Sequence, residues 1–168
     1  MTMVTACGKP PGGVIMDFED EADLDRLLWK CHATFERTEA ISGHGRYALT
    51  AKLFPEELYP GVEFFDPPRD WRGYRAFAFT VYAPDAAGET LHIRIDDNPD
   101  DRDFEGRYQG YVKLTGAVQH VEIPLDEIRN QPPQGPLSLG TIRKLVIYLY
   151  NQDKPRTLVL DDLRLVGP

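Results

Sequence analysis

A succession of short β-type runs constrains the fold of this chain more than any other feature of its sequence. Runs rich in Val, Ile, Tyr, Phe and Thr alternate with clusters of Gly, Pro, Asp and Asn, which favour turns. The 14 Gly and 14 Pro stand mostly between the runs, where they do not interrupt a sheet. We expect ten strands, at Val14–Phe18, Ala33–Arg37, Tyr47–Leu53, Gly61–Phe65, Ala76–Tyr82, Thr90–Asp96, Tyr108–Leu114, Gln119–Ile123, Leu145–Tyr150 and Thr157–Val166.

Helical patterns are scarce by comparison. Asp20–Trp29 carries leucines on one side and predicts a turn or two of helix, while Asp126–Arg129 and Thr141–Lys144 each predict a single turn. Ten strands with so little helix predict an all-β domain of two antiparallel sheets packed face to face, a β-sandwich or jelly roll, over residues 13–168. We expect residues 1–12 to form a flexible tail or tether.

The charge of the chain excludes two classes of partner. Its 168 residues include 19 Lys+Arg and 27 Asp+Glu, a formal net charge of −8. This argues against a nucleic-acid binder, which needs a basic face, and against docking on an anionic membrane. No apolar run approaches the length of a membrane-spanning helix, so we also expect no transmembrane segment.

Two cysteines, Cys7 and Cys31, are too few for a disulfide framework and lack the spacing of a zinc site. We expect Cys31 to be a free buried thiol and Cys7 a thiol on the tail. Alternatively, Val4–Cys7 resembles the end of a bacterial lipoprotein signal, although only three residues stand before it. That interpretation would place the protein outside the cytoplasm or at the cell surface.

Four of the expected strands each separate an aliphatic face from a polar and aromatic one, because alternate residues of a strand point to opposite sides. They are the strands that begin near residues 76, 90, 108 and 145. If they share one sheet, their second faces form a single surface. The candidate ligand-binding residues on that surface are Tyr82, His92, Arg94, Asp96, Gln109, Tyr111, Tyr148 and Tyr150.

This combination of side chains suits a carbohydrate. Tyrosine rings cover the apolar C–H faces of sugars with rigid area, and Arg, Asp, Gln and His form hydrogen bonds with hydroxyl groups. A concave sheet bearing them would be a groove for a polysaccharide. The alternative is an ordinary solvent-facing surface, in which Arg94 and Asp96 form a cross-strand ion pair of little consequence.

Several segments together resemble carbohydrate-binding modules of the galactose-binding-domain-like β-sandwich superfamily. They are Val14–Asp20, Ser42–Leu49, Trp71–Tyr74, Val121–Leu125 and Leu158–Leu165, and the resemblance covers roughly residues 13–167. The order and spacing of the segments carry the likeness, since each one alone is common. The resemblance implies a jelly roll that binds an oligosaccharide or polysaccharide without catalysis.

The resemblance also implies a structural Ca²⁺ where the first and last strands meet the loop before the third. Glu19 matches the N-terminal side-chain ligand, and Asp161 or Asp162 matches the C-terminal one. Carbonyls around residues 42–45 would complete the shell, with Asp17 as an extra ligand. Such a mixture of carboxylate and carbonyl oxygens suits Ca²⁺. The alternatives are that the acids bind loop backbone or begin a helical turn, or that a nearby lysine or arginine replaces the metal.

Other functions have weaker signals. The chain has no Gly-x-Ser-x-Gly elbow, no His-Glu-x-x-His helix and no phosphate loop, so we expect no enzyme. The acidic loop Asp96–Asp103 lacks the glycine and glutamate of a helix-loop-helix calcium site. It is either a solvated turn or a rim of the groove, in which Asp96, Asp97 and Arg107 contact ligand hydroxyls. The competing hypothesis is a protein-interaction, assembly or spacer domain of a larger surface protein, with an apolar patch that begins at Phe64, Phe65 and Trp71.

Overall fold

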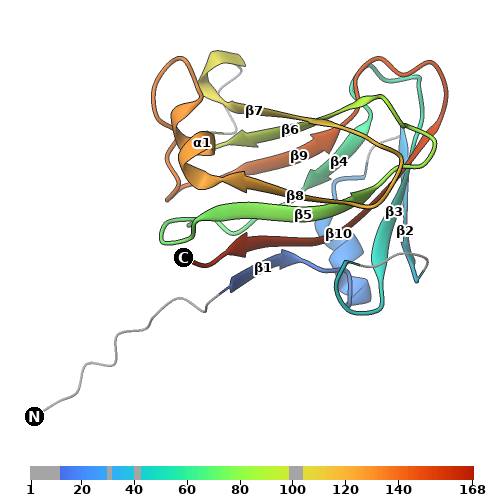
Figure 1. Ribbon diagram of the computed structural model, residues 1–168, viewed down its shortest axis with the longest axis horizontal. Helices are drawn as coiled ribbons and strands as arrows, with labels where there is room; N and C mark the ends of the chain where they lie inside the picture. Colours follow the sequence, from blue (N-terminus) through green and yellow to red (C-terminus); the bar gives the residue numbers. More distant parts are fainter. Residues whose placement is uncertain (1–11, 30–31, 40–42, 99–103) are drawn as a thin grey trace, which may run out of the picture.

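A computed structural model describes residues 12–29, 32–39, 43–98 and 104–168. These residues form two antiparallel sheets packed as a β-sandwich (Figure 1), which confirms the predicted fold class. All ten predicted strands are present, with ends that differ from the prediction by two residues or fewer. They are β1 (Gly12–Met16), β2 (Ala33–Thr38), β3 (Ala48–Leu53), β4 (Gly61–Phe64), β5 (Ala76–Tyr82), β6 (Thr90–Asp96), β7 (Tyr108–Lys113), β8 (Gln119–Pro124), β9 (Lys144–Tyr148) and β10 (Arg156–Val166).

The larger sheet has six strands in the order β2-β3-β10-β5-β8, with β1 paired to β10. The 11-residue β10 organises this sheet, because its first half pairs with β3, its last part pairs with β1, and β5 lies along its other side. The smaller sheet has the order β4-β9-β6-β7. The strands of the two sheets are interspersed along the sequence.

The interior is built from the aliphatic and aromatic faces that the sequence predicts. Side chains at alternate positions of a strand point inward and are removed from water, which is the main source of stability. Trp71 also lies in the core, where it stacks on Phe77 at 5.5 Å and donates a hydrogen bond from Nε1 to the Pro68 carbonyl at 2.7 Å. Fully buried strand residues include Phe77, Phe79, Val81, Leu91, Ile93, Ile95, Leu145 and Ile147.

The helical segments are short. A 3-10 helix, η1 (Glu21–Arg26), begins where the Asp20 carboxylate accepts a hydrogen bond from the Ala22 N–H. The predicted turn after β8 is the helix α1 (Leu125–Asn130), and a second 3-10 turn, η2 (Phe104–Gly106), has no counterpart in the prediction.

The helical turn predicted at Thr141–Lys144 is wrong. The N–H groups of Ile142 and Arg143 donate instead to the carbonyls of Arg69 and Asp96. These bonds between distant parts of the chain lead it directly into β9, which begins at Lys144. A local pattern does not reveal such long-range partners.

Candidate ligand-binding site

An aromatic row crosses the outer face of the smaller sheet. Tyr148 on β9 stands opposite Gly61 on β4 and His92 on β6, and His92 stands opposite Tyr111 on β7. The His92 ring stacks on Tyr148 with 5.0 Å between centroids and meets the edge of Tyr111 at 5.1 Å. The strand register therefore joins four strands into one row, in which glycine leaves room for a ring.

Two further tyrosines extend this row into an aromatic strip, by which we mean Tyr59, His92, Tyr111, Tyr148 and Tyr150. Tyr59, from the loop before β4, lies 5.4 Å from Tyr150 and 5.9 Å from Tyr148, measured between ring centroids. Tyr111, Tyr59 and Tyr150 are 59%, 53% and 48% exposed, whereas Tyr148 is buried. The strip therefore offers three accessible phenol rings held around a buried centre.

Charged side chains occupy the next rows of the same face. Arg94 on β6 donates from Nε to the Asp96 carboxylate at 2.7 Å. On the neighbouring strands, Lys144 lies 3.3 Å from the Glu63 carboxylate, measured from Nζ to Oε1. Asp96 pairs across the sheet with Lys144. These rows supply charged hydrogen-bonding groups beside the rings.

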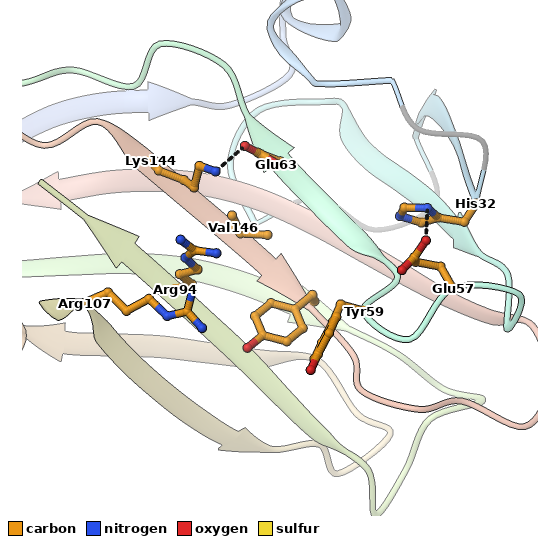
Figure 2. Close-up of a pocket in the computed structure, with 9 residues that line it drawn as sticks. His32, Glu57, Tyr59, Glu63, Arg94, Arg107, Lys144 and Val146 are labelled. Carbon is orange, nitrogen blue, oxygen red and sulfur yellow. Dashed lines mark ion pairs between the residues drawn. The ribbon is translucent and has the colours of Figure 1, made fainter. Parts of the chain in front are cut away.

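Between the aromatic strip and the charged rows lies a pocket of about 510 Å³. Figure 2 shows Arg94 and Arg107 at one end of it, and His32 with Glu57 at the other. The pocket is lined by His32, Glu57, Tyr59, Glu63, Arg94, Arg107, Lys144, Val146 and Tyr148.

Gln109 holds Tyr148, the centre of the strip, in place. Tyr148 donates its hydroxyl hydrogen to Gln109 Oε1 at 3.2 Å, and the Gln109 side chain is almost fully buried. The Gln109 backbone exchanges two hydrogen bonds with the side chain of Gln131, at 3.0 and 2.6 Å. Gln109 Nε2 has no hydrogen-bond partner among the described residues. Gln109 thus fixes Tyr148 and does not line the pocket.

Burial sets the ionisation of this face. It lowers the pKa of His92, and it raises the pKa of Tyr148. The two stacked rings are therefore neutral at pH 7. Burial also raises the pKa of Asp96, against the opposite influence of Arg94 beside it.

The structure brings seven of the eight predicted ligand-binding residues onto one face, and it corrects the eighth. Tyr82 ends β5, which lies in the larger sheet between β10 and β8. Its neighbours Phe79 and Val81 point into the core, so Tyr82 points away from the smaller sheet. The expectation that four strands share one sheet is wrong for this strand, because alternation shows faces but not which sheet a strand joins.

Several pocket residues had no sequence signal strong enough to identify them. Tyr59 and Glu57 come from the loop between β3 and β4, and His32 precedes β2. Glu63 and Lys144 lie on strands but face the pocket only through the register of β4 with β9 and of β9 with β6. Arg107, by contrast, is one of the residues that the rim interpretation of the acidic loop named as a ligand contact, and it lines the pocket.

The acids expected to bind Ca²⁺ hold the segment 43–47 in another way. Glu19 Oε1 accepts hydrogen bonds from the N–H groups of Arg46 and Tyr47, both at 2.8 Å. Asp161 accepts from the N–H groups of Gly43 and His44. The bonds from Tyr47 and Arg46 lower the pKa of Glu19. Acids from both ends of the chain therefore bind backbone N–H groups of this segment.

Asp162, another expected ligand, is also engaged by a donor, since it binds the guanidinium of Arg164. Close to these acids, Arg37 donates to the carbonyls of Phe18 at 2.8 Å and Glu19 at 3.1 Å. In the ranges that the structure describes, no three His, Cys, Asp or Glu side chains are grouped to hold a metal ion. This donor set does not match the oxygen shell that Ca²⁺ requires, and the calcium site stays a prediction.

Solved structures of other proteins share this β-sandwich fold. The family 11 carbohydrate-binding module from Clostridium thermocellum, solved in complex with a β-1,3-1,4-mixed-linked tetrasaccharide, has a TM-score of 0.68 and 18% identity over 93% of this chain and 95% of that one. TmCBM61, in complex with β-1,4-galactotriose, has a TM-score of 0.56 and 14% identity over 92% of this chain and 99% of that one. An exo-β-agarase has a TM-score of 0.65 and 13% identity, and the match covers 93% of this chain but 26% of the agarase.

At these identities the likeness shows the fold, which is that of the carbohydrate-binding β-sandwiches. No model of a known protein family matches the chain, and no curated protein matches it.

Among the described residues, no helix is long and apolar enough to cross a membrane. Cys7, Cys31 and residues 1–11 lie outside the described residues, and so do Ser42 and residues 99–103.

Proposed function

We propose that this chain is a non-catalytic carbohydrate-binding module, and that it holds an oligosaccharide or polysaccharide against the outer face of its smaller sheet. The observation that carries the proposal is the continuity of the aromatic strip with a pocket rich in charged hydrogen-bonding groups. Rings and charges at such close spacing match the alternating C–H faces and hydroxyl edges of a sugar chain.

The strip is organised before any ligand arrives. Tyr148 is fixed by its hydrogen bond to Gln109 and by stacking on His92, so little side-chain entropy is lost at the centre. The exposed rings of Tyr59, Tyr111 and Tyr150 extend the surface beyond the pocket. We therefore expect a chain of several sugar units to bind better than one, because a single unit covers only part of the strip.

The carboxylates near the pocket favour binding over turnover. Glycoside hydrolysis requires two carboxyl groups held across the scissile bond. Here Glu63 lies against Lys144, and Asp96 is buried against Arg94. Both acids are in ion pairs within the sheet, which disfavours their use as a catalytic pair and supports binding without turnover on this face.

The competing function, a protein-interaction or spacer domain, has less in its favour. Phe64 and Trp71, two of the three residues expected to begin an apolar docking patch, are buried in the core, and only Phe65 is exposed.

We also propose that the module works outside the cytoplasm as part of a larger surface or secreted protein. The agarase, most of whose chain lies outside the match, shows this fold within a longer chain. Lipidation at Cys7 would be one means of attachment.

Calorimetric titration tests the proposal. Mixed-linkage β-glucan, xylan, β-1,4-galactan and an acidic polymer such as polygalacturonate are each titrated into the protein. Tyr111→Ala and Tyr150→Ala should each weaken binding about tenfold, since one aromatic contact is worth roughly 0.5–1.5 kcal/mol beyond its buried area. Tyr82→Ala, on the other sheet, is the matched control and should bind normally. If no polymer bound at millimolar concentration, or if Tyr82→Ala weakened binding as much as the other two, the proposal would fail.

A further inference from the structure

A second hollow adjoins the pocket on the outer face of the smaller sheet. It has a volume of about 480 Å³ and shares two lining residues with the pocket, Glu63 and Lys144. The side chains of these two residues form an ion pair, which Figure 2 shows at the border of the pocket. The pocket and the second hollow therefore meet at this pair.

Phe65 gives the second hollow an aromatic surface. It directly follows β4, and because Phe64 before it is buried in the core, alternation points the Phe65 ring outward, where the residue is 59% exposed. The register of β4 with β9, continued by one residue, places Phe65 level with Lys144, four residues along β9 from Tyr148. At roughly 3.3 Å per residue this separation is about 13 Å, which is more than one sugar unit spans.

Charged side chains stand beside the Phe65 ring. Arg69, Arg143 and Asp66 all line the second hollow, and the Asp66 carboxylate lies 3.8 Å from Arg69 Nε. The second hollow therefore repeats the combination found at the pocket, an exposed ring next to groups that form hydrogen bonds with hydroxyls. A protein partner fits less well, because protein docking surfaces have a continuous apolar centre.

Backbone hydrogen bonds between distant segments fix the walls of the second hollow. The Phe65 N–H donates to the Arg26 carbonyl at 2.7 Å, and the Leu28 N–H donates to the Glu63 carbonyl at 2.9 Å. A further bond of 2.8 Å joins the loop before β5 to the segment before β9. The hollow is thus formed before a ligand binds, and filling it requires little ordering of the chain.

We infer that the second hollow is a further sugar-binding subsite. A linear polysaccharide that fills the pocket continues over the ion pair along β4 and β9, and a later unit of the same chain stacks on Phe65. The Glu63 and Lys144 side chains are only 12% and 25% exposed, so they do not form a wall between the two hollows. This inference rests on the proposed function and specifies the course of the ligand and the length of chain that it needs.

Oligosaccharides of graded length test the subsite. Mixed-linkage β-glucan, xylan, β-1,4-galactan and polygalacturonate, with their fragments from disaccharide to hexasaccharide, are titrated by calorimetry into the unmodified protein and into Phe65→Ala. We expect Phe65→Ala to weaken binding of the polymer and the hexasaccharide about fivefold to tenfold, and to leave binding of the shortest bound fragment unchanged. Phe65→Leu, which is apolar but has no ring, should lose most of the same affinity. Tyr82→Ala, on the larger sheet, is the control, and thermal melting checks that each variant is folded.

Phe65→Trp reports directly on whether the second hollow is occupied. Because the ring is larger, this variant should bind the polymer at least as tightly as the unmodified protein. Its fluorescence emission should change when the polymer or the hexasaccharide is added, and should stay constant with the shortest bound fragment. The unmodified protein, which contains only Trp29 and Trp71, provides the background signal.

The possible failures are distinguishable. A polymer that binds equally well to the unmodified protein and to Phe65→Ala overturns the subsite and leaves the carbohydrate-binding module intact. An equal loss of affinity for short and long fragments also overturns it, since Phe65 would then act through the pocket or the fold. Self-association in sedimentation that Phe65→Ala abolishes would assign the hollow to a second copy of the chain instead. If no polymer binds, the proposed function itself is wrong.

Discussion

Gly61 connects the fold to the binding face, and replacing it with alanine should disturb both. It stands opposite Tyr148 in the pairing of β4 with β9. A Cβ atom at this position would lie 2.4 Å from the Tyr148 Cβ and 2.6 Å from the Ile147 carbonyl oxygen. Neither atom belongs to the flexible end of a side chain, so the two strands themselves must separate.

The geometry sets the size of the effect. Non-bonded carbon atoms prefer a separation of roughly 3.5–4.0 Å, so Gly61→Ala would push β4 and β9 apart by about 1 Å at this point. Overpacking of this kind costs about 1–3 kcal/mol. For a chain of this length, each kcal/mol lowers the melting temperature by roughly 2–4 °C. We therefore expect a fall of roughly 2–12 °C. Because Tyr148 moves with its strand, ligand affinity should fall as well.

Differential scanning calorimetry measures the stability, and titration with the best-bound polymer measures the affinity. Gly140→Ala is the control, because its Cβ would meet only the exposed side chain of Arg72, at 3.1 Å, and that side chain is able to move. We expect Gly140→Ala to melt close to the unmodified protein. A Gly61→Ala protein that melted with the control and bound ligand normally would refute the argument that glycine is required beneath the strip.

Two further predictions concern the loop anchors and pH. Chelation with EDTA should leave the melting temperature unchanged, and a fall of several degrees would instead establish the predicted calcium. Arg37→Ala should lower the free energy of unfolding by about 1–3 kcal/mol, because it removes the donor to two backbone carbonyls and a guanidinium 4.0 Å above the Tyr47 ring. Because burial lowers the pKa of His92 in the folded state, its neutral form stabilises the fold above pH 6.5, and this contribution is lost as the pH falls through 6.5 and below. His92→Gln should therefore show a smaller loss of stability between about pH 7 and pH 5, and an identical pH profile in the two proteins would contradict this role.

The strand faces could be predicted from sequence because burial imposes a period of two. Leu91, Ile93 and Ile95 are fully buried, and His92 and Arg94 between them point to the outer face, as alternation requires. The same reasoning placed Tyr148 on the outer side of its strand. Local alternation therefore identified most of the face on which we place the ligand.

The alternation of side chains does not show which strands pair with each other in a sheet. Tyr82 has the same local pattern as Tyr148, yet its strand pairs within the larger sheet. The depth of a side chain is equally hidden, since Gln109 is of a residue type that suits a ligand contact, yet it is buried and bound to Tyr148. Tyr59 reaches the pocket from a loop whose path depends on the finished sandwich. Register and loop course are properties of the whole fold, and only the structure supplies them.

The acids that bind the segment 43–47 show the same limit of prediction from sequence. An acid at position 19 and another at position 161 serve equally well as ligands of a cation or as acceptors of backbone N–H groups. The direction of the backbone between them decides which, because an N–H group turned toward an acid donates a hydrogen bond to it, whereas a carbonyl turned the same way would share a metal ion with it. Here Gly43, His44, Arg46 and Tyr47 all present N–H groups to Glu19 or Asp161. Glu19 and Asp161 therefore connect the two ends of the chain through this segment, whether or not a metal is part of the site.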